Sequence, residues 1–201
     1  KVTASNIFDS GKTIIRTIIV VEDITEYRET EKALRIQAEK DLTLDLYNKT
    51  AIEREIRAFL YSPIVFIGMH ALFINDEFGH PLGDKVLKMF TKILKEVFPT
   101  SDLIGRLGGD EFILVFKDGE SIEIINEKAQ LLCEKTKDIG KMLQISRETT
   151  VSIGIALIPS DGREYSELYR KADVALYYSK ESGRGRYTIY SDKLKTKIDT
   201  N

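Results

Sequence analysis

The chain has 201 residues, of which 42% are hydrophobic and 31% charged, and its formal net charge is −2. A chain of this length and composition can bury one substantial core and carry an appendage. The near-neutral balance excludes the broad basic field that binds nucleic-acid polymers, so any phosphate ligand must be held by a few local cations. A mononucleotide meets that condition better than a polymer.

The number of cysteines and the hydropathy of the sequence indicate where in the cell the chain is expected. Cys133 is the only cysteine in the sequence, which excludes an intrachain disulfide and indicates a reducing, cytoplasmic location. The richest apolar run, from Thr13 to Val21, contains Arg16 and is shorter than the roughly 18 residues that span a bilayer, so no membrane segment is expected here. A start at Lys1 rather than Met is consistent with a piece of a longer protein, which membrane spans elsewhere could attach to a membrane.

The first segments predict a β-hairpin followed by a polar helix. Residues 2–8 and the β-branched run 13–21 are separated by turn residues, a pattern typical of two antiparallel strands. Residues 25–40 are rich in charged side chains and alanine with a thin apolar seam, which predicts a solvated helix. That helix either joins two copies of the chain as a parallel coiled coil or serves as a plain linker.

Residues 41–49 break the helical periodicity, and the globular domain begins there. Helices alternate with strands beyond this point, but one pair of strands is joined by a tight hairpin, so the sheet must contain an antiparallel pair. The predicted fold class is α/β: a palm-like mixed antiparallel and parallel sheet flanked by helices, preceded by the β-hairpin and the linker helix. The periodicities predict helices over about 52–60, from Pro81 to Val97, over 120–137 and from Tyr165 to Gly183, and strands over 63–69, 103–107, 112–116, 151–158 and 186–190.

The tip of the tight hairpin carries the most informative local pattern. Gly108 and Gly109 end one apolar run, and Asp110 and Glu111 precede the next, which predicts a hairpin with a Gly-Gly turn. Glycines let a ligand approach without meeting a Cβ, and adjacent carboxylates offer oxygens to Mg²⁺, which can hold a triphosphate. The alternative is a solvated turn, since Gly and Asp are turn residues whatever the function.

Other short sequence motifs lie before and after this hairpin, in a definite order along the chain. They are Asp41 to Lys49, Ile74-Asn75-Asp76 with Gly79-His80 and Gly83-Asp84, Arg106 with Gly108 to Phe112, Ser152-Ile153-Gly154, and Ala172 to Tyr177 with Lys180, Gly183 and Arg184. This set resembles the GGDEF domain of the diguanylate cyclase family, which joins two GTP molecules into cyclic di-GMP. The resemblance covers about residues 41–190 and implies Mg²⁺ as cofactor.

The resemblance implies nucleotide contacts for four residues outside the hairpin. Asn75 and Asp84 match family residues that hold the guanine, and a carboxylate accepts the N1 and N2 hydrogens that adenine cannot supply. Lys180 and Arg184 match residues that contact the phosphates. The alternatives are a loop asparagine, an aspartate favoured by the helix dipole, and basic residues at a helix C-terminus.

Within the hairpin, the resemblance implies catalysis and metal binding. Asp110 matches the family's metal-binding carboxylate, Glu111 matches the acidic residue beside it, and Gly108 and Gly109 lie against the nucleotide.

The departures from the family pattern concern the metal and the product-inhibition site. Active members carry an Asp-x-Asp-x-Phe-Lys word where residues 67–72 read Ile-Gly-Met-His-Ala-Leu. Ile67 replaces a metal-binding Asp and Leu72 a phosphate-contacting Lys, so we expect a weakened Mg²⁺ site. Pro99 replaces the Arg of the inhibitory pair and leaves Asp102 as its remnant.

Four regions are expected along the chain. Residues 1–24 resemble the end of a PAS sensor domain, although a hairpin that belongs to the main domain is the alternative. A signalling linker over 25–40, a GGDEF domain over 41–192 and a polar tail over 193–201 would follow.

The sequence supports three functional hypotheses. The first is a degenerate GGDEF module that binds GTP or a related guanine nucleotide and passes a signal from an upstream sensor within a homodimer. The second is an active cyclase that holds enough Mg²⁺ without the strand carboxylate. The third is a ligand-free dimerisation module.

Overall fold

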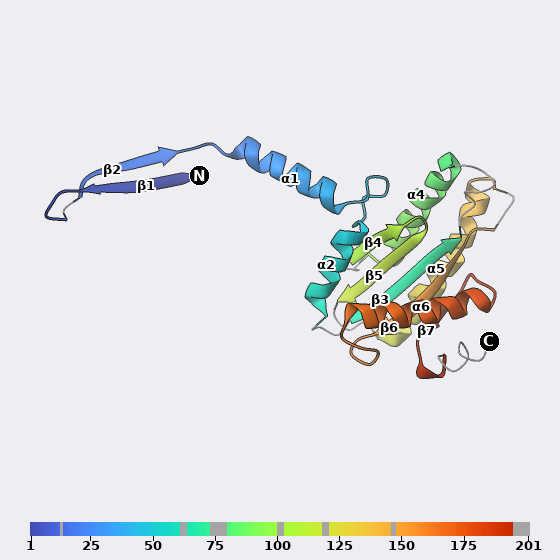
Figure 1. Cartoon of the computed structure of the whole chain (residues 1–201). Coiled ribbons are helices and arrows are strands. Elements are labelled where there is room, and N and C mark those ends of the chain that lie inside the picture. Colours follow the sequence, from blue (N-terminus) through green and yellow to red (C-terminus); the bar gives the residue numbers. More distant parts are fainter. Residues whose placement is uncertain are drawn as a thin grey trace. The chain divides into compact units, whose positions relative to one another are not determined.

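The computed structural model describes residues 1–12, 14–60, 64–72, 80–99, 103–117, 121–145 and 148–194 (Figure 1). The chain divides into two compact units, Lys1–Ala38 and Glu39–Asn201. Across the described ranges, no helix combines the length and the hydropathy needed to cross a bilayer.

The first unit contains the predicted hairpin and most of the predicted polar helix. Strand β1 (Val2–Phe8) pairs antiparallel with β2 (Ile14–Val21), and helix α1 (Thr25–Glu39) follows. Asp23 accepts hydrogen bonds from the hydroxyl and the backbone N–H of Thr25, and these bonds lower the pKa of its carboxyl. No residue of α1 is buried, so the helix contributes no core of its own.

The second unit is built on a sheet with the order β4-β5-β3-β6-β7. The central strand β3 is antiparallel to both neighbours, β4 is antiparallel to β5, and β6 is parallel to β7. The predicted mixed sheet is therefore confirmed. Its strands are β3 (Ile64–Leu72), β4 (Leu103–Gly108), β5 (Glu111–Lys117), β6 (Thr150–Leu157) and β7 (Tyr187–Ile189).

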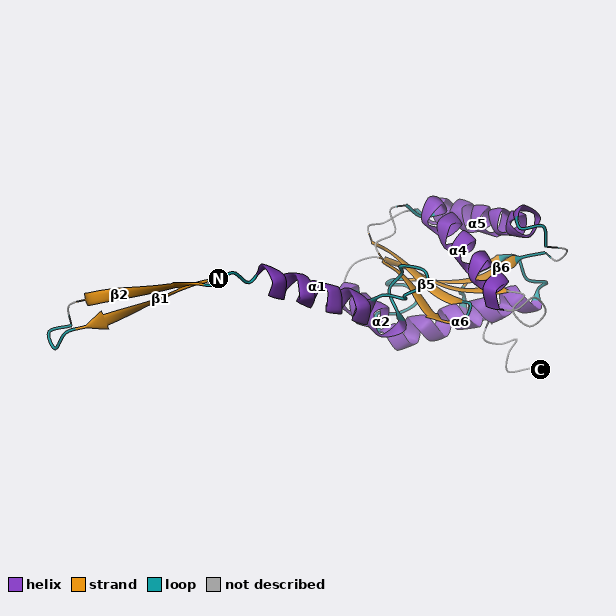
Figure 2. Cartoon of the chain, turned by 90° about the horizontal axis from the view of Figure 1, so that it is seen from above, coloured by secondary structure: helices purple, strands orange, loops and turns teal. Residues whose placement is uncertain are grey.

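Helices cover both faces of this sheet (Figure 2). Helices α4 and α5 pack on one face, and α2 and α6 pack on the other. The side chain of Asn48 caps α2 by accepting from the N–H of Ala51. The bounds are α2 (Lys49–Phe59), α4 (His80–Val97), α5 (Ile122–Met142) and α6 (Tyr165–Glu181), with a short 3-10 helix at Asp192–Leu194.

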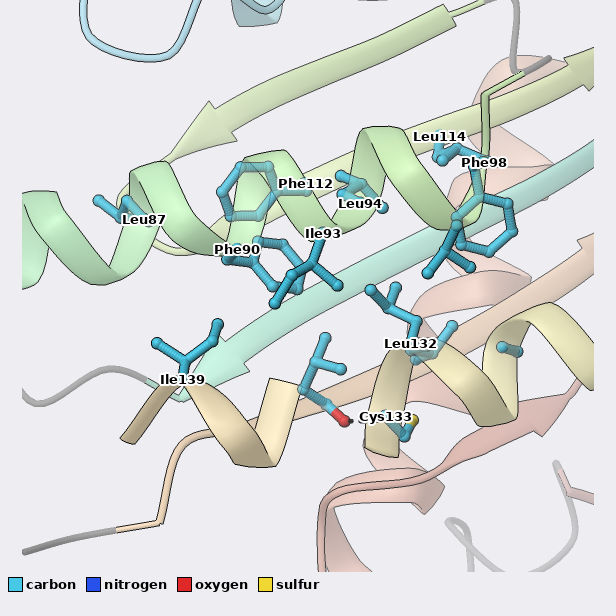
Figure 3. Close-up of a cluster of buried hydrophobic side chains, with 14 of the residues drawn as sticks. Leu87, Phe90, Ile93, Leu94, Phe98, Phe112, Leu114, Leu132, Cys133 and Ile139 are labelled. Atoms are coloured by element: carbon cyan, nitrogen blue, oxygen red, sulfur yellow. Dashed lines mark hydrogen bonds between the residues drawn. The ribbon is translucent and has the colours of Figure 1, made fainter. Parts of the chain in front are cut away.

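Strand β5 divides the core because successive side chains of a strand point to opposite faces. Phe112 and Leu114 join the cluster beneath α4 and α5, where the rings of Phe112 and Phe90 lie 5.1 Å apart between centroids (Figure 3). Ile113 and Val115 join the cluster beneath α2 and α6. All four β5 side chains are buried, so this one strand is shared by both layers.

Two elements run farther than predicted. Strand β3 ends at Leu72 and not near position 69, because pairing with β6 continues to the Leu72–Thr150 partners. Helix α5 ends at Met142 and not near 137, since Ile139 is still buried in the core.

Two glycines that face each other in the sheet differ in the space around them. Gly68 pairs with Gly154 in the β3–β6 register. A Cβ on Gly68 would lie 3.6 Å from the Cβ of Ala172, an ordinary contact, whereas a Cβ on Gly154 would overlap the carbonyl oxygen of Ala172 and the backbone nitrogen of Leu176. Helix α6 therefore crosses β6 too closely for any side chain at position 154.

We predict that Gly154→Ala lowers the free energy of unfolding by about 3 kcal/mol, because the backbone of α6 must shift to make room. Gly68→Ala, the matched control, should change it by less than about 1 kcal/mol. Equilibrium unfolding in urea measures both variants. Equal effects would contradict the close approach of α6 to β6.

Candidate functional site

A two-residue turn closes the hairpin between β4 and β5. The predicted Gly-Gly turn is wrong, because a register shift after Arg106 pairs Gly108 with Glu111, and the turn consists of Gly109 and Asp110. Gly109 has a left-handed φ of 48°, which glycine adopts without steric cost. No described atom lies within 4 Å of a Cβ built on Gly108 or Gly109, so this side of the turn is open.

Arg106 holds the turn in place. Its Nε and Nη2 atoms donate to the carbonyl oxygen of Gly109 at 2.9 and 2.8 Å, and Nη1 donates to Oδ2 of Asp41 at 3.0 Å. The side chains of this ion pair are only 15% and 20% exposed. A guanidinium offers its donors in a rigid fork, so one side chain fixes both the turn and the junction segment 41–49.

Asp41 organises the junction segment in turn. Its Oδ1 accepts from the backbone N–H groups of Thr43 and Leu44, both at 3.0 Å, and Tyr47 exchanges backbone hydrogen bonds with β4. Asp45 has a left-handed φ of 51°. Aspartate is among the few residues that enter this region readily, so the segment takes this turn without a glycine.

A pocket opens beside the hairpin, between the sheet and α6. Its polar lining consists of Glu111 at the start of β5 and of Tyr169, Asp173 and Lys180 on α6. The cavity volume is about 40 Å³, which admits only a few atoms, so a nucleotide could place one end here but not its whole length. The apolar lining comes from Gly68, Leu107, Phe112, Ile113, Ala172 and Leu176.

Lys180 supplies the positive charge of this pocket. It is half-buried and forms no ion pair or hydrogen bond with another described side chain. Burial raises the pKa of Tyr169, and the neighbouring Glu111 and Asp173 raise it further. The phenol therefore stays protonated at neutral pH and remains a hydrogen-bond donor beside the ammonium group.

The C-terminal end of α6 is anchored to the sheet. Buried Ser179 donates from its Oγ to the carbonyl oxygen of Ile153 at 2.7 Å, and the N–H of Arg184 donates to the carbonyl oxygen of Ser179 at 3.0 Å. Gly183, with a φ of 109°, takes the predicted left-handed conformation just after the helix. Lys180 and exposed Arg184 are thus carried by one fixed helix end.

Of the two predicted guanine contacts, the one that the structure describes, Asp84, does not line this pocket. Asp84 is exposed on α4, which lies on the opposite face of the sheet from α6. Because α4 begins at His80, Asp84 lies beyond the first turn, where the helix dipole has little effect. Asn75 lies outside the described residues, as does the inhibitory-site remnant Asp102, while Pro99 is exposed after α4.

The described residues do not complete a magnesium site. Ile67 pairs with Leu114 on one side and Ile155 on the other, and β3 contains no carboxylate. The ladder partner of Glu111 is His70, and imidazole is a poor ligand for Mg²⁺. Within the described ranges, no three His, Cys, Asp or Glu side chains gather in a way that could hold a metal ion.

Sequence reasoning missed two residues of the pocket. Tyr169 and Asp173 precede Lys180 by eleven and seven positions and line the same pocket. Residues at these spacings share one face of a helix, so a helical projection centred on Lys180 would have indicated both. The contribution of Gly68 was also missed, because it depends on which strand face α6 covers.

The chain is similar to bacterial signalling proteins. A family model described as "Diguanylate cyclase, GGDEF domain" matches residues 38–186. Signaling protein YkoW of Bacillus subtilis (strain 168) is 33% identical over 189 residues, which are 89% of this chain and 24% of that protein. Cyclic di-GMP phosphodiesterase PdeR of Escherichia coli (strain K12) is 30% identical over 196 residues, 94% of this chain and 30% of that protein. The chain spans less than a third of either relative.

The fold is similar to a solved structure of the same kind. The coiled coil and GGDEF domain of DgcB from Caulobacter crescentus, in complex with c-di-GMP, gives a TM-score of 0.70, with 83% of this chain and 93% of that chain covered. The sequences are 22% identical, so this likeness establishes the fold alone.

We predict that Arg106→Ala lowers the free energy of unfolding by about 2–3 kcal/mol, since it leaves a half-buried carboxylate and the turn carbonyl without their donor. Arg54→Ala, which removes the more exposed ion pairs with Glu39 and Glu55, should cost less than about 1 kcal/mol. Urea unfolding measures both, and amide hydrogen exchange at Asp110 and Glu111 should accelerate only in the Arg106 variant. Unchanged exchange there would mean that Arg106 does not hold the turn.

Proposed function

The chain belongs to the diguanylate cyclase GGDEF domain family, and on that premise we propose that it is a guanine-nucleotide-binding regulatory module of cyclic di-GMP signalling with impaired cyclase activity. One observation supports the proposal: Lys180, which we assign to the phosphates, lines a pocket beside the hairpin, whereas the strand that we assign to the metal has no acidic residue. Glu111 and Lys180 line one pocket, and β3 offers no carboxylate.

Lys180 supports phosphate binding in a pocket whose other two charged lining residues, Glu111 and Asp173, are acidic. The ammonium group of Lys180 has no competing anion bound to it among the described side chains, so it is free to pair with a phosphate. The protonated phenol of Tyr169 adds a neutral donor beside it. Arg184 is exposed just past the end of the same helix, and we assign it to the phosphates on the family resemblance. We assign the guanine to Asp84 and Asn75, on the family resemblance.

The residues of β3 support impaired turnover. In the family reaction the 3′-hydroxyl of one GTP attacks the α-phosphorus of another, and charge accumulates on phosphoryl oxygens and pyrophosphate. Mg²⁺ supplies several kcal/mol of stabilisation at that stage. Ile67 and its two ladder partners are aliphatic, so this chain provides no carboxylate there. Asp110 and Glu111 would have to coordinate Mg²⁺ without a carboxylate from β3.

The intact hairpin favours the second candidate, an active cyclase. The turn with Asp110 is held by Arg106 as a catalytic loop would need to be. This candidate requires that Asp110, Glu111 and backbone carbonyls hold enough Mg²⁺ by themselves. The relatives favour neither candidate, since a family model named for diguanylate cyclase and a protein named as a cyclic di-GMP phosphodiesterase both match this chain.

We further propose that α1 joins two copies of the chain and receives a signal from an upstream, PAS-like sensor. Ile24, Tyr27, Glu31, Leu34 and Ala38 follow a heptad spacing of 3, 4, 3 and 4, and none of the α1 residues is buried. Tyr27 and Leu34 are 69% and 60% exposed, so the seam is available to a second helix.

We predict that GTP and GDP, but not ATP, raise the thermal midpoint. Saturation at a hundred times Kd contributes about 2.7 kcal/mol, or about 5–11 °C for a domain of this size. Asp84→Ala should abolish the preference for guanine, Lys180→Ala should weaken binding of GTP, and Lys141→Ala on the far helix α5 should do neither. Equal midpoint shifts from ATP and GTP would remove the guanine assignment.

We predict that the chain makes cyclic di-GMP about a thousandfold more slowly than a competent family member, which corresponds to roughly 4 kcal/mol of lost transition-state stabilisation. Product formation at saturating GTP and Mg²⁺ is measured by chromatography. The triple variant Ile67→Asp, Met69→Asp, Leu72→Lys should recover activity only if β3 can present these side chains to the hairpin. Robust synthesis by the unmodified chain would establish the active cyclase instead.

A further inference from the structure

Helix α4 carries an uninterrupted row of lysines on its outer side. Lys85, Lys88, Lys92 and Lys95 are spaced by three, four and three residues, and all four are exposed. At 100° per residue they fall within an arc of about 80°. The opposite side of α4 faces the core through residues such as Phe90 and Leu94 (Figure 3), so the row points away from the sheet.

These four lysines have no partner among the described residues, in contrast to lysines elsewhere on the same unit. None of them forms an ion pair with a described acid. By comparison, Lys137 lies 3.8 Å from Glu148, Lys141 lies 3.0 Å from Asp138 and Lys171 lies 3.2 Å from Glu167. The row is therefore a local concentration of unpaired positive charge on a chain whose net charge is −2.

The acidic residues that border the row do little to neutralise it. Glu96 is already engaged by Lys135 of α5 at 3.7 Å, and Asp84 stands at the N-terminal end of the row. Like charges three and four residues apart destabilise a helix. The row contributes nothing to the core, and its positive charge remains available to an anionic partner.

The chemistry of the surroundings selects the kind of partner. An anionic membrane would also meet α5, which covers the same face of the sheet and exposes Glu123, Glu127 and Glu134. A nucleic acid would gain from exposed aromatic rings for stacking, yet Phe90, the one Phe, Tyr or Trp in α4, is buried. A narrow row of ammonium groups along a single helix instead matches carboxylates spaced along a single peptide segment.

We propose that the outer side of α4 is a docking surface for an acidic segment of a partner protein. The row begins beside Asp84, the residue assigned above to guanine, so a docked acidic segment would lie at the edge of the nucleotide site. Docking depends on the four lysines and not on nucleotide binding, and the two proposals therefore stand or fall separately.

The test measures binding of a fluorescent poly-L-glutamate peptide to the full 201-residue chain. The variant Lys88→Glu, Lys92→Glu should weaken binding by about tenfold or more, because repulsion replaces attraction at the centre of the row. The matched control, Lys137→Glu, Lys141→Glu, changes the net charge equally on α5 and should leave binding within about twofold. The milder Lys88→Gln, Lys92→Gln should give an intermediate loss.

Folding and alternative partners are controlled in the same experiment. The thermal midpoint of the α4 variants should change little, since attraction of the new residues to Lys85 and Lys95 offsets repulsion from Asp84 and Glu96. Equal loss in the α4 and α5 variants, or no binding by the unmodified chain, would overturn the proposal. Stronger α4-dependent binding to phosphatidylglycerol vesicles or to single-stranded RNA than to the peptide would overturn it in favour of those partners. A variant that shows no shift of its thermal midpoint with GTP tests the nucleotide proposal and not the docking proposal.

Discussion

The contact of Arg106 with Gly109 and Asp41 is the constraint on which the candidate site depends. A short turn that carries a carboxylate has little packing of its own, so its direction must be set from elsewhere. Arg106 sets it from a strand of the sheet, and the same guanidinium fixes the junction segment. Glu39, the last residue of α1, is also held by Arg54 at 2.9 Å.

The alternation of β5 explains why the predicted site residues are divided between two faces of the sheet. Ile113 and Val115 pack beneath α2 and α6, and Glu111 continues the same alternate row to the mouth of the pocket. The other row packs beneath α4, the helix that carries Asp84. A ligand that contacts both α4 and α6 would have to reach around the edge of the sheet. The geometry of the sheet alone therefore does not assemble such a binding site.

Periodicity predicted most of the fold, since apolar residues at helical or strand spacing reflect burial directly. Pairing register was not predictable, because it depends on contacts between distant segments. The sequence predicts a turn at the two glycines, whereas a register shift pairs Gly108 with Glu111 in the strand ladder. For the same reason the predicted strand ends near position 69, although β3 continues to Leu72. The same limit applies to the site. Short sequence motifs predict Lys180 and Glu111 as site residues. Tyr169 and Asp173 are identified only from the structure, where α6 and the hairpin line one pocket. Asn75 and Asp102 lie outside the described residues.

The β1–β2 ribbon has a consequence for the physical behaviour of this chain. Its apolar side chains are open to solvent, with Ile19, Val20 and Val21 at 62%, 57% and 75% exposure, and each strand has one edge unpaired within this two-stranded sheet. Unpaired edges with β-branched side chains are templates for strand addition and aggregation. Precipitation of the purified chain would then originate in the ribbon while the GGDEF domain stays folded, so colloidal stability and thermodynamic stability belong to different units of the molecule.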